Sequence, residues 1–238
     1  MISVDIIEYI ISLTTLFIAF LFSITIGGVV RAWSAEAAGD DTAVEQGFGS
    51  FNPLIYLDLL GLLVLFIWKF GWGVYVPVTS ANIRGPARYV KLLAVLFSDT
   101  FVHIMLALAG IVVLIASFGS NILILLRPIF LAYQMFSPHI FSRVAPELSS
   151  ISLSALFMVI AMVYVNTGLA FISVLRNAVF VGMQMVIQRY AGNNAYLNIL
   201  LIAVPLVLAL FFSNALYFGI INTILALSTA LAHAVGAS

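Results

Sequence analysis

Long apolar runs limit the fold of this chain more than any other feature. The runs from Tyr9 to Val30 and from Leu92 to Phe118 each reach or exceed the roughly 20 residues that an α-helix needs to cross a bilayer. Of the 238 residues, 64% are hydrophobic and only 8% are charged, whereas a soluble domain carries about 25% charged residues. A soluble core of this size cannot bury so much apolar surface, so we predict that the lipid bilayer is the solvent and exclude a free soluble enzyme.

The whole chain, residues 1–238, is predicted to form one all-α, polytopic transmembrane domain with about six transmembrane helices. Besides the two runs above, apolar stretches cover 53–70, 151–175, 196–213 and 215–235, and the last two predict a pair of helices over about 196–235. The stretch 121–136 is shorter and contains Arg127 and Pro128, which indicates a tilted half-span or an interfacial helix. Residues 176–189 are expected to be amphipathic, with Arg176, Gln184, Gln188 and Arg189 on the polar side.

The segment at 71–78 departs from the helical pattern. Valines at 74, 76 and 78 alternate with other residues, and Gly71, Gly73 and Pro77 disfavour a helix. Extended backbone at membrane depth is tolerated only where protein or water covers it. We therefore predict a short re-entrant or interfacial extended segment here.

Charge and cysteine content exclude several classes of function. Nine basic and nine acidic residues cancel, so no nucleic-acid-binding surface is indicated, and there are no cysteines for disulfides or thiolate metal sites. The basic loop with Arg84, Arg88 and Lys91 is predicted to face the cytoplasm.

Three stretches in the first half of the chain share their order and spacing with the motifs of a known family. Residues 26–33 read I-G-G-V-V-R-A-W, where that family has roughly V-H-E-F-A-H-A-W. Residues 52–61 read N-P-L-I-Y-L-D-L-L-G and residues 70–78 read F-G-W-G-V-Y-V-P-V, close to its N-P-L-x-H-x-D-P-x-G and F-G-W-x-x-P-V-P-V. With a weaker match from Asn166 onward, the chain over about 10–190 resembles the short bacterial branch of the site-2 proteases, which are intramembrane zinc metalloproteases.

The chain departs from the family pattern at the positions that bind zinc and supply the general base in the family. Two histidines one helical turn apart bind zinc in such enzymes, and the glutamate after the first is the general base. At those positions this chain has Gly27, Gly28 and Arg31, and Val181 stands in place of the aspartate that would complete the site. The resemblance therefore implies a bacterial inner-membrane pseudoprotease, without catalytic residues, metal or other cofactor.

Four ionisable residues are candidates for polar contacts inside the membrane: Arg31, Asp58, Asp99 and His103. One hypothesis is that Arg31 takes the place of zinc as the local cation and pairs with Asp58 or Asp99, and the alternative is that it extends to the lipid headgroups. Asp58 could pair with Arg31 or Lys69. Asp99 and His103 share a helix face, either as the start of a relocated metal site or as packing residues with local hydrogen bonds.

The function we expect is that of a scaffold subunit, docked with other integral membrane proteins in a hetero-oligomeric complex. A second hypothesis is a pseudoprotease that binds or sequesters transmembrane client proteins in the old substrate cleft. A metalloprotease with relocated ligands rests only on Asp99 and His103. A transporter is disfavoured because polar residues are scattered along the spans.

Overall fold

The computed structural model describes residues 2–69, 71–118 and 150–190, together with three isolated helical positions at 222, 226 and 230. Its elements, in chain order, are α1 (Ile2–Ala38), α2 (Thr42–Glu45), the 3-10 helix η1 (Pro53–Tyr56), α3 (Leu59–Trp68), α4 (Arg88–Phe118) and α7 (Ser150–Tyr190). No strand occurs among these described residues, in agreement with the predicted all-α class.

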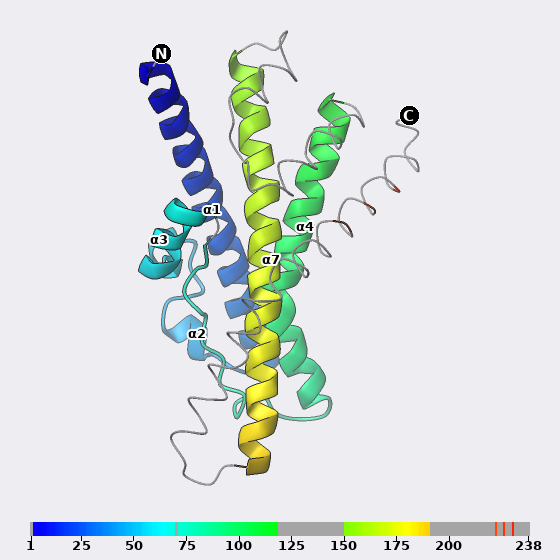
Figure 1. Ribbon diagram of the computed structural model, residues 1–238. Helices are drawn as coiled ribbons and strands as arrows, with labels where there is room; N and C mark the ends of the chain where they lie inside the picture. Colours follow the sequence, from blue (N-terminus) through cyan, green and yellow to red (C-terminus); the bar gives the residue numbers. More distant parts are fainter. Residues whose placement is uncertain are drawn as a thin grey trace.

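Three long helices form the body of the molecule. Each of α1, α4 and α7 packs against the other two, and α4 runs antiparallel to both (Figure 1). Within the described ranges, three helices are long and apolar enough to cross a membrane: Ile10–Ala38, Arg88–Phe118 and Ser154–Ala178. They correspond to three of the predicted spans. The predictions for 121–136 and for the helix pair at about 196–235 lie outside the described residues, apart from the three isolated positions.

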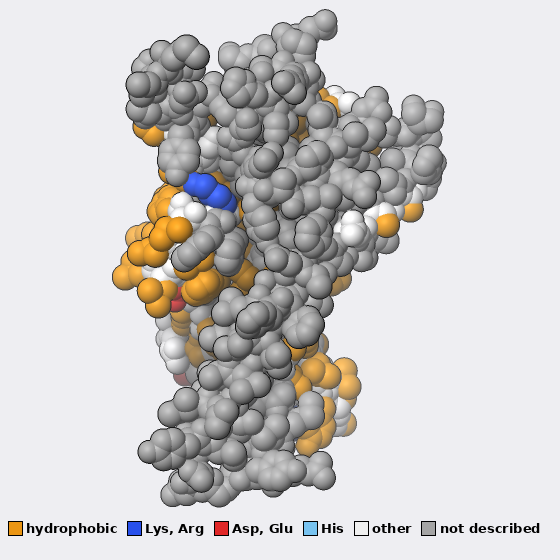
Figure 2. Space-filling view, in the orientation of Figure 1, with side chains coloured by type: hydrophobic (Ala, Val, Ile, Leu, Met, Phe, Trp, Pro, Cys, Tyr) orange, Lys and Arg blue, Asp and Glu red, His pale blue; other side chains and the backbone are white. Residues whose placement is uncertain are grey.

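The prediction that residues 53–70 form a span is wrong. The stretch is divided into η1 and the ten-residue helix α3, which is only about 15 Å long and cannot cross the hydrocarbon layer. Asp58 starts α3 as its N-cap, with its carboxylate accepting a hydrogen bond from Gly61 N at 2.7 Å. Lys69 ends the helix in the left-handed region at φ 64°. Exposed apolar side chains of α3 gather on the face seen in Figure 2, which suits contact with lipid: Leu59, Leu60, Leu63, Phe66 and Ile67.

The boundary predicted at 175, between the span 151–175 and the amphipathic residues 176–189, does not interrupt the helix. Helix α7 continues without a break for 41 residues. Neither glycine nor proline occurs between Leu169 and Val181, so nothing in the backbone stops the helix there.

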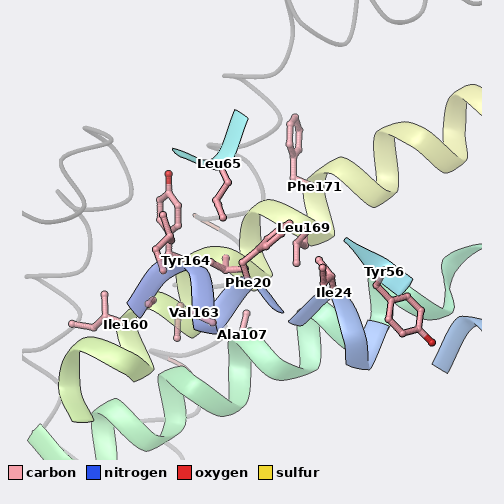
Figure 3. Packing of buried hydrophobic residues seen from close by; sticks show 14 of the residues in the cluster. Phe20, Ile24, Tyr56, Leu65, Ala107, Ile160, Val163, Tyr164, Leu169 and Phe171 are labelled. Carbon is pink, nitrogen blue, oxygen red and sulfur yellow. The ribbon is translucent and has the colours of Figure 1, made fainter. Parts of the chain in front are cut away.

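The core lies where α1, α4 and α7 meet, with α3 and η1 against one side (Figure 3). Phe20 and Ile24 of α1 pack with Ala107 of α4 and with a row of buried residues on α7 that includes Val163 and Leu169. Helices α4 and α7 approach closely at Gly110. A Cβ added at this glycine would lie 2.5 Å from Val163 Cγ2, so a small residue sets the spacing of the two helices.

Residues 71–79 adopt neither helix nor strand. The departure from helix that the sequence predicts is present, but no strand forms. Val74 N donates a hydrogen bond to Tyr56 O at 2.8 Å, and a Cβ on Gly73 would lie 2.8 Å from that same oxygen and 3.1 Å from Ile24 Cβ. The segment is therefore held tightly between η1 and α1.

Asp40, just after α1, binds the loop that leads into α4. Its fully buried carboxylate accepts hydrogen bonds from Thr42 Oγ1 at 2.5 Å, Thr79 N at 2.6 Å and Asn82 Nδ2 at 2.9 Å. Burial raises the pKa of Asp40, but the combined hydrogen bonds from Thr42, Asn82 and Thr79 outweigh burial and hold the pKa below its ordinary value. The short loop between α1 and α2 that holds Asp40 is thus a structural junction.

Candidate functional site

A small polar cavity of about 30 Å³ lies where α1, α4, α7 and the 71–79 segment converge. Its ionisable lining residues are Arg31 from α1, Asp99 and His103 from α4, and Arg176 from α7. Apolar side chains such as Ile24, Leu169 and Ile172 complete the wall. There is room for a water molecule or a small polar group.

Two arginines share one carboxylate in this cavity. Asp99 Oδ2 lies 3.3 Å from Arg31 Nη1 and 2.6 Å from Arg176 Nη2. The other carboxylate oxygen, Oδ1, accepts a hydrogen bond from Thr100 N at 2.9 Å. Arg31 is 1% exposed and Asp99 is 5% exposed, so the pair is screened from water. We call Arg31, Asp99 and Arg176 the ion cluster.

Neutral groups hold the Arg31 guanidinium from several sides. Its Nη1 donates to Asn177 Oδ1 at 3.2 Å and to Leu96 O at 3.3 Å, and its Nη2 donates to Tyr75 OH at 2.6 Å. The Tyr75 ring also lies 4.3 Å from the guanidinium carbon of Arg31 and 4.8 Å from that of Arg176, within the range of cation–π attraction. The ion cluster therefore joins all three long helices and the 71–79 segment.

A second polar contact crosses the helices one turn away. His103 Nδ1 lies 2.9 Å from Asn166 Oδ1, and Asn166 Nδ2 donates to Ser23 Oγ at 2.9 Å. The imidazole packs closely against Gly27, because a Cβ added there would lie 2.6 Å from His103 Nε2 and 2.7 Å from Cε1. The room that a side chain at position 27 would need is already filled by His103.

Tyr56 fills the space beside the next glycine in the same way. A Cβ on Gly28 would lie 2.2 and 2.3 Å from two carbons of the Tyr56 ring. The ring cannot move aside freely, since its hydroxyl donates to Phe48 O and approaches Ser50 O at 3.1 Å. Burial raises the pKa of Tyr56 to about 12, which keeps the phenol protonated as a donor.

The structure brings together three of the four polar residues singled out in the sequence, namely Arg31, Asp99 and His103. Of the two partners that the sequence left open for Arg31, the structure gives Asp99. Asp58 instead caps α3. Val181 is half-buried on α7, five residues beyond Arg176, and is not part of the cavity wall.

Sequence reasoning missed four residues of the site: Tyr75, Asn166, Arg176 and Asn177. The sequence indicates Arg176 only as a polar-side residue of the amphipathic stretch 176–189, whereas its guanidinium lies 2.6 Å from Asp99 in the cavity. An arginine that interrupts a run of more than twenty apolar residues was the signal that could have found it. The two asparagines carried no comparable signal, because their partners are far away in the sequence.

The zinc of the protease family that the motifs resemble does not fit these residues. A catalytic zinc needs about three protein ligands and an open position. The cavity offers only two such side chains among the described residues, Asp99 and His103. Asp99 Oδ2 is already shared by the guanidinium groups of Arg31 and Arg176, which repel a divalent cation. Within the described residues, no three His, Cys, Asp or Glu side chains are grouped so as to bind a metal.

Comparison with known proteins adds a distant relationship. The chain is 31% identical over 110 residues to the protein named "Putative zinc metalloprotease YwhC" of Bacillus subtilis (strain 168), and the match covers 45% of this chain and 49% of that protein. The chain thus spans about half the length of the curated relative it matches. No family model matches the chain, and no solved structure matches it. Together with the three apolar helices, this relationship indicates a membrane protein distantly related to the protein of that name.

Proposed function

We propose that this chain is a non-catalytic, site-2-protease-like membrane protein that serves as a structural subunit of a larger membrane complex. The observation that carries the proposal is the ion cluster. Arg31 stands at the position of a zinc-binding histidine in the motif resemblance, and it lies 3.3 Å from Asp99 in the cavity. In this proposal the guanidinium of Arg31, a cation that belongs to the chain itself, takes the place of a metal ion in the cavity.

The packing around the two glycines supports the same proposal. His103 lies against Gly27 and Tyr56 lies against Gly28, so the volume of the first histidine and of the general base is taken by other side chains. An activated water needs a Lewis acid and a base within hydrogen-bond reach. With Arg31, Gly27 and Gly28 at the motif positions, the chain supplies neither of them there.

A structural role suits what remains of such a fold. The ion cluster and the His103–Asn166–Ser23 contact fasten three helices together, and little of the chain lies outside apolar segments. A helical body of this kind can present its outer faces to neighbouring membrane proteins. In this proposal the partners are integral membrane proteins of the bacterial inner membrane.

The test is purification of the tagged chain from its native membrane in two different mild detergents, followed by quantification of the proteins that accompany it. The proposal expects the same few membrane proteins in fixed ratio to this chain in both detergents. A changing population of single-span proteins would instead support client binding by a pseudoprotease. Recovery of the chain alone from both detergents would contradict the scaffold role.

A further inference from the structure

The ion cluster carries an unbalanced positive charge. Two guanidinium groups, Arg31 and Arg176, face a single carboxylate, Asp99. A buried ion is stable only when its charge is compensated and its hydrogen-bonding groups are occupied. One carboxylate cannot neutralise both arginines, so among the described residues the cluster keeps a net charge of one positive unit.

Hydrogen bonding in the cluster is incomplete as well. Arg31 Nε and Arg176 Nε are both buried, and neither has a hydrogen-bond partner within the part of the chain that the structure describes. Arg31 is only 1% exposed, so bulk water does not reach its Nε, and leaving such a buried donor unpaired is unfavourable. Both arginines line the cavity. Two unpaired N–H donors and an uncompensated positive charge beside the cavity are the features that an anion-binding site needs.

We infer that Arg31 and Arg176 bind a phosphate-type anion in this cavity, supplied either by a phospholipid headgroup or by free phosphate. Arginine is suited to this role because its planar donors match the oxygens of a phosphate. Arg31 lies seven residues before the end of α1. At 1.5 Å per residue this offset is about 10 Å, within reach of a headgroup at that end of the helix. Basic pockets between transmembrane helices bind anionic lipid headgroups for the same reason.

The experiment measures the thermal unfolding midpoint of the full-length chain after removal of lipid in detergent. One arm adds inorganic phosphate against chloride at equal ionic strength, and the other compares nanodiscs of phosphatidylglycerol with nanodiscs of phosphatidylcholine. We expect the anion to raise the midpoint by roughly 5 °C at saturation in at least one arm, because a ligand bound to the folded state stabilises it. A rise with phosphate assigns the site to the free ion, and a rise with phosphatidylglycerol alone assigns it to the headgroup.

Three variants make the result specific to the cavity. Arg176→Gln, whose side chain is 30% exposed, should lose most of the rise, whereas Arg88→Gln, at an exposed arginine that donates to Ser80 O, should keep it. Asp99→Asn should show a larger rise than the wild type, because the net charge of the cluster increases from one to two. No rise in either arm, or an equal rise in Arg176→Gln, would overturn the inference. The measurement needs no partner protein, so its failure would leave the proposed scaffold role standing.

Discussion

Replacing Asp99 by asparagine should destabilise the fold strongly. The carboxylate is 5% exposed and is the shared partner of Arg31 and Arg176, at 3.3 and 2.6 Å. Removing one partner of a buried ion pair costs about 3–5 kcal/mol, since the charge left behind has no compensation. At about 2–4 °C per kcal/mol for a chain of this size, the unfolding midpoint should fall by about 6–20 °C.

The assay follows the fluorescence of the three tryptophans during heating in a mild detergent without phosphate. Asp41→Asn is the matched control, because Asp41 is exposed and makes no side-chain cap, and it should change stability by no more than about 0.5 kcal/mol. The double variant Asp99→Asn/Arg31→Met should recover part of the loss, since both buried charges of the pair are gone. An Asp99→Asn midpoint equal to that of the control would refute the reasoning.

Three further predictions concern the packing and the junction loop. Gly28→Ala should lower the free energy of unfolding by about 1–3 kcal/mol through its clash with the Tyr56 ring, and Gly28→Ala in a Tyr56→Ala background should cost much less in the same thermal assay. Asn166→Leu should cost about 1–3 kcal/mol by leaving His103 unpaired, whereas a midpoint like that of the wild type would show the contact to be dispensable. Asp40→Asn should cost about 1–3 kcal/mol at pH 7. Because the folded-state pKa of Asp40 is lowered, the stability that its carboxylate contributes is complete above the unfolded value of 3.8 and is lost as pH falls through the folded pKa. The difference in stability between Asp40→Asn and wild type should therefore shrink below about pH 4. A difference that stays constant below that pH would contradict the role of Asp40.

The sequence predicted the parts of this structure that depend on local composition. Hydrophobic length alone identified the three described spans, and glycine and proline at 71–78 marked the departure from helix. The motif resemblance matched Arg31 to the position of a zinc-binding histidine, and the cost of a charge in lipid left two alternatives, pairing with Asp58 or Asp99 or extension to the lipid headgroups. That Asp99 is the partner depended on how α1 and α4 pack, which no local pattern records.

Other features depended on backbone continuity and on tertiary contacts. Residues 53–70 are apolar enough for a span, but Asp58 caps a new helix and divides the run. Helix α7 passes through Arg176 because nothing stops it, and that continuity brings the arginine to Asp99. The fit of His103 on Gly27 joins residues more than seventy positions apart, so only the folded chain reveals it.

The most direct test of the central claim is the zinc content of the protein purified from its native membrane and dialysed against metal-free buffer. The claim is that Arg31 and its carboxylate partner occupy the place of a metal in a protease-like fold. It predicts far less than one zinc per chain, unchanged in the variant His103→Gln. Close to one zinc per chain that survives dialysis and is lost in His103→Gln would contradict it.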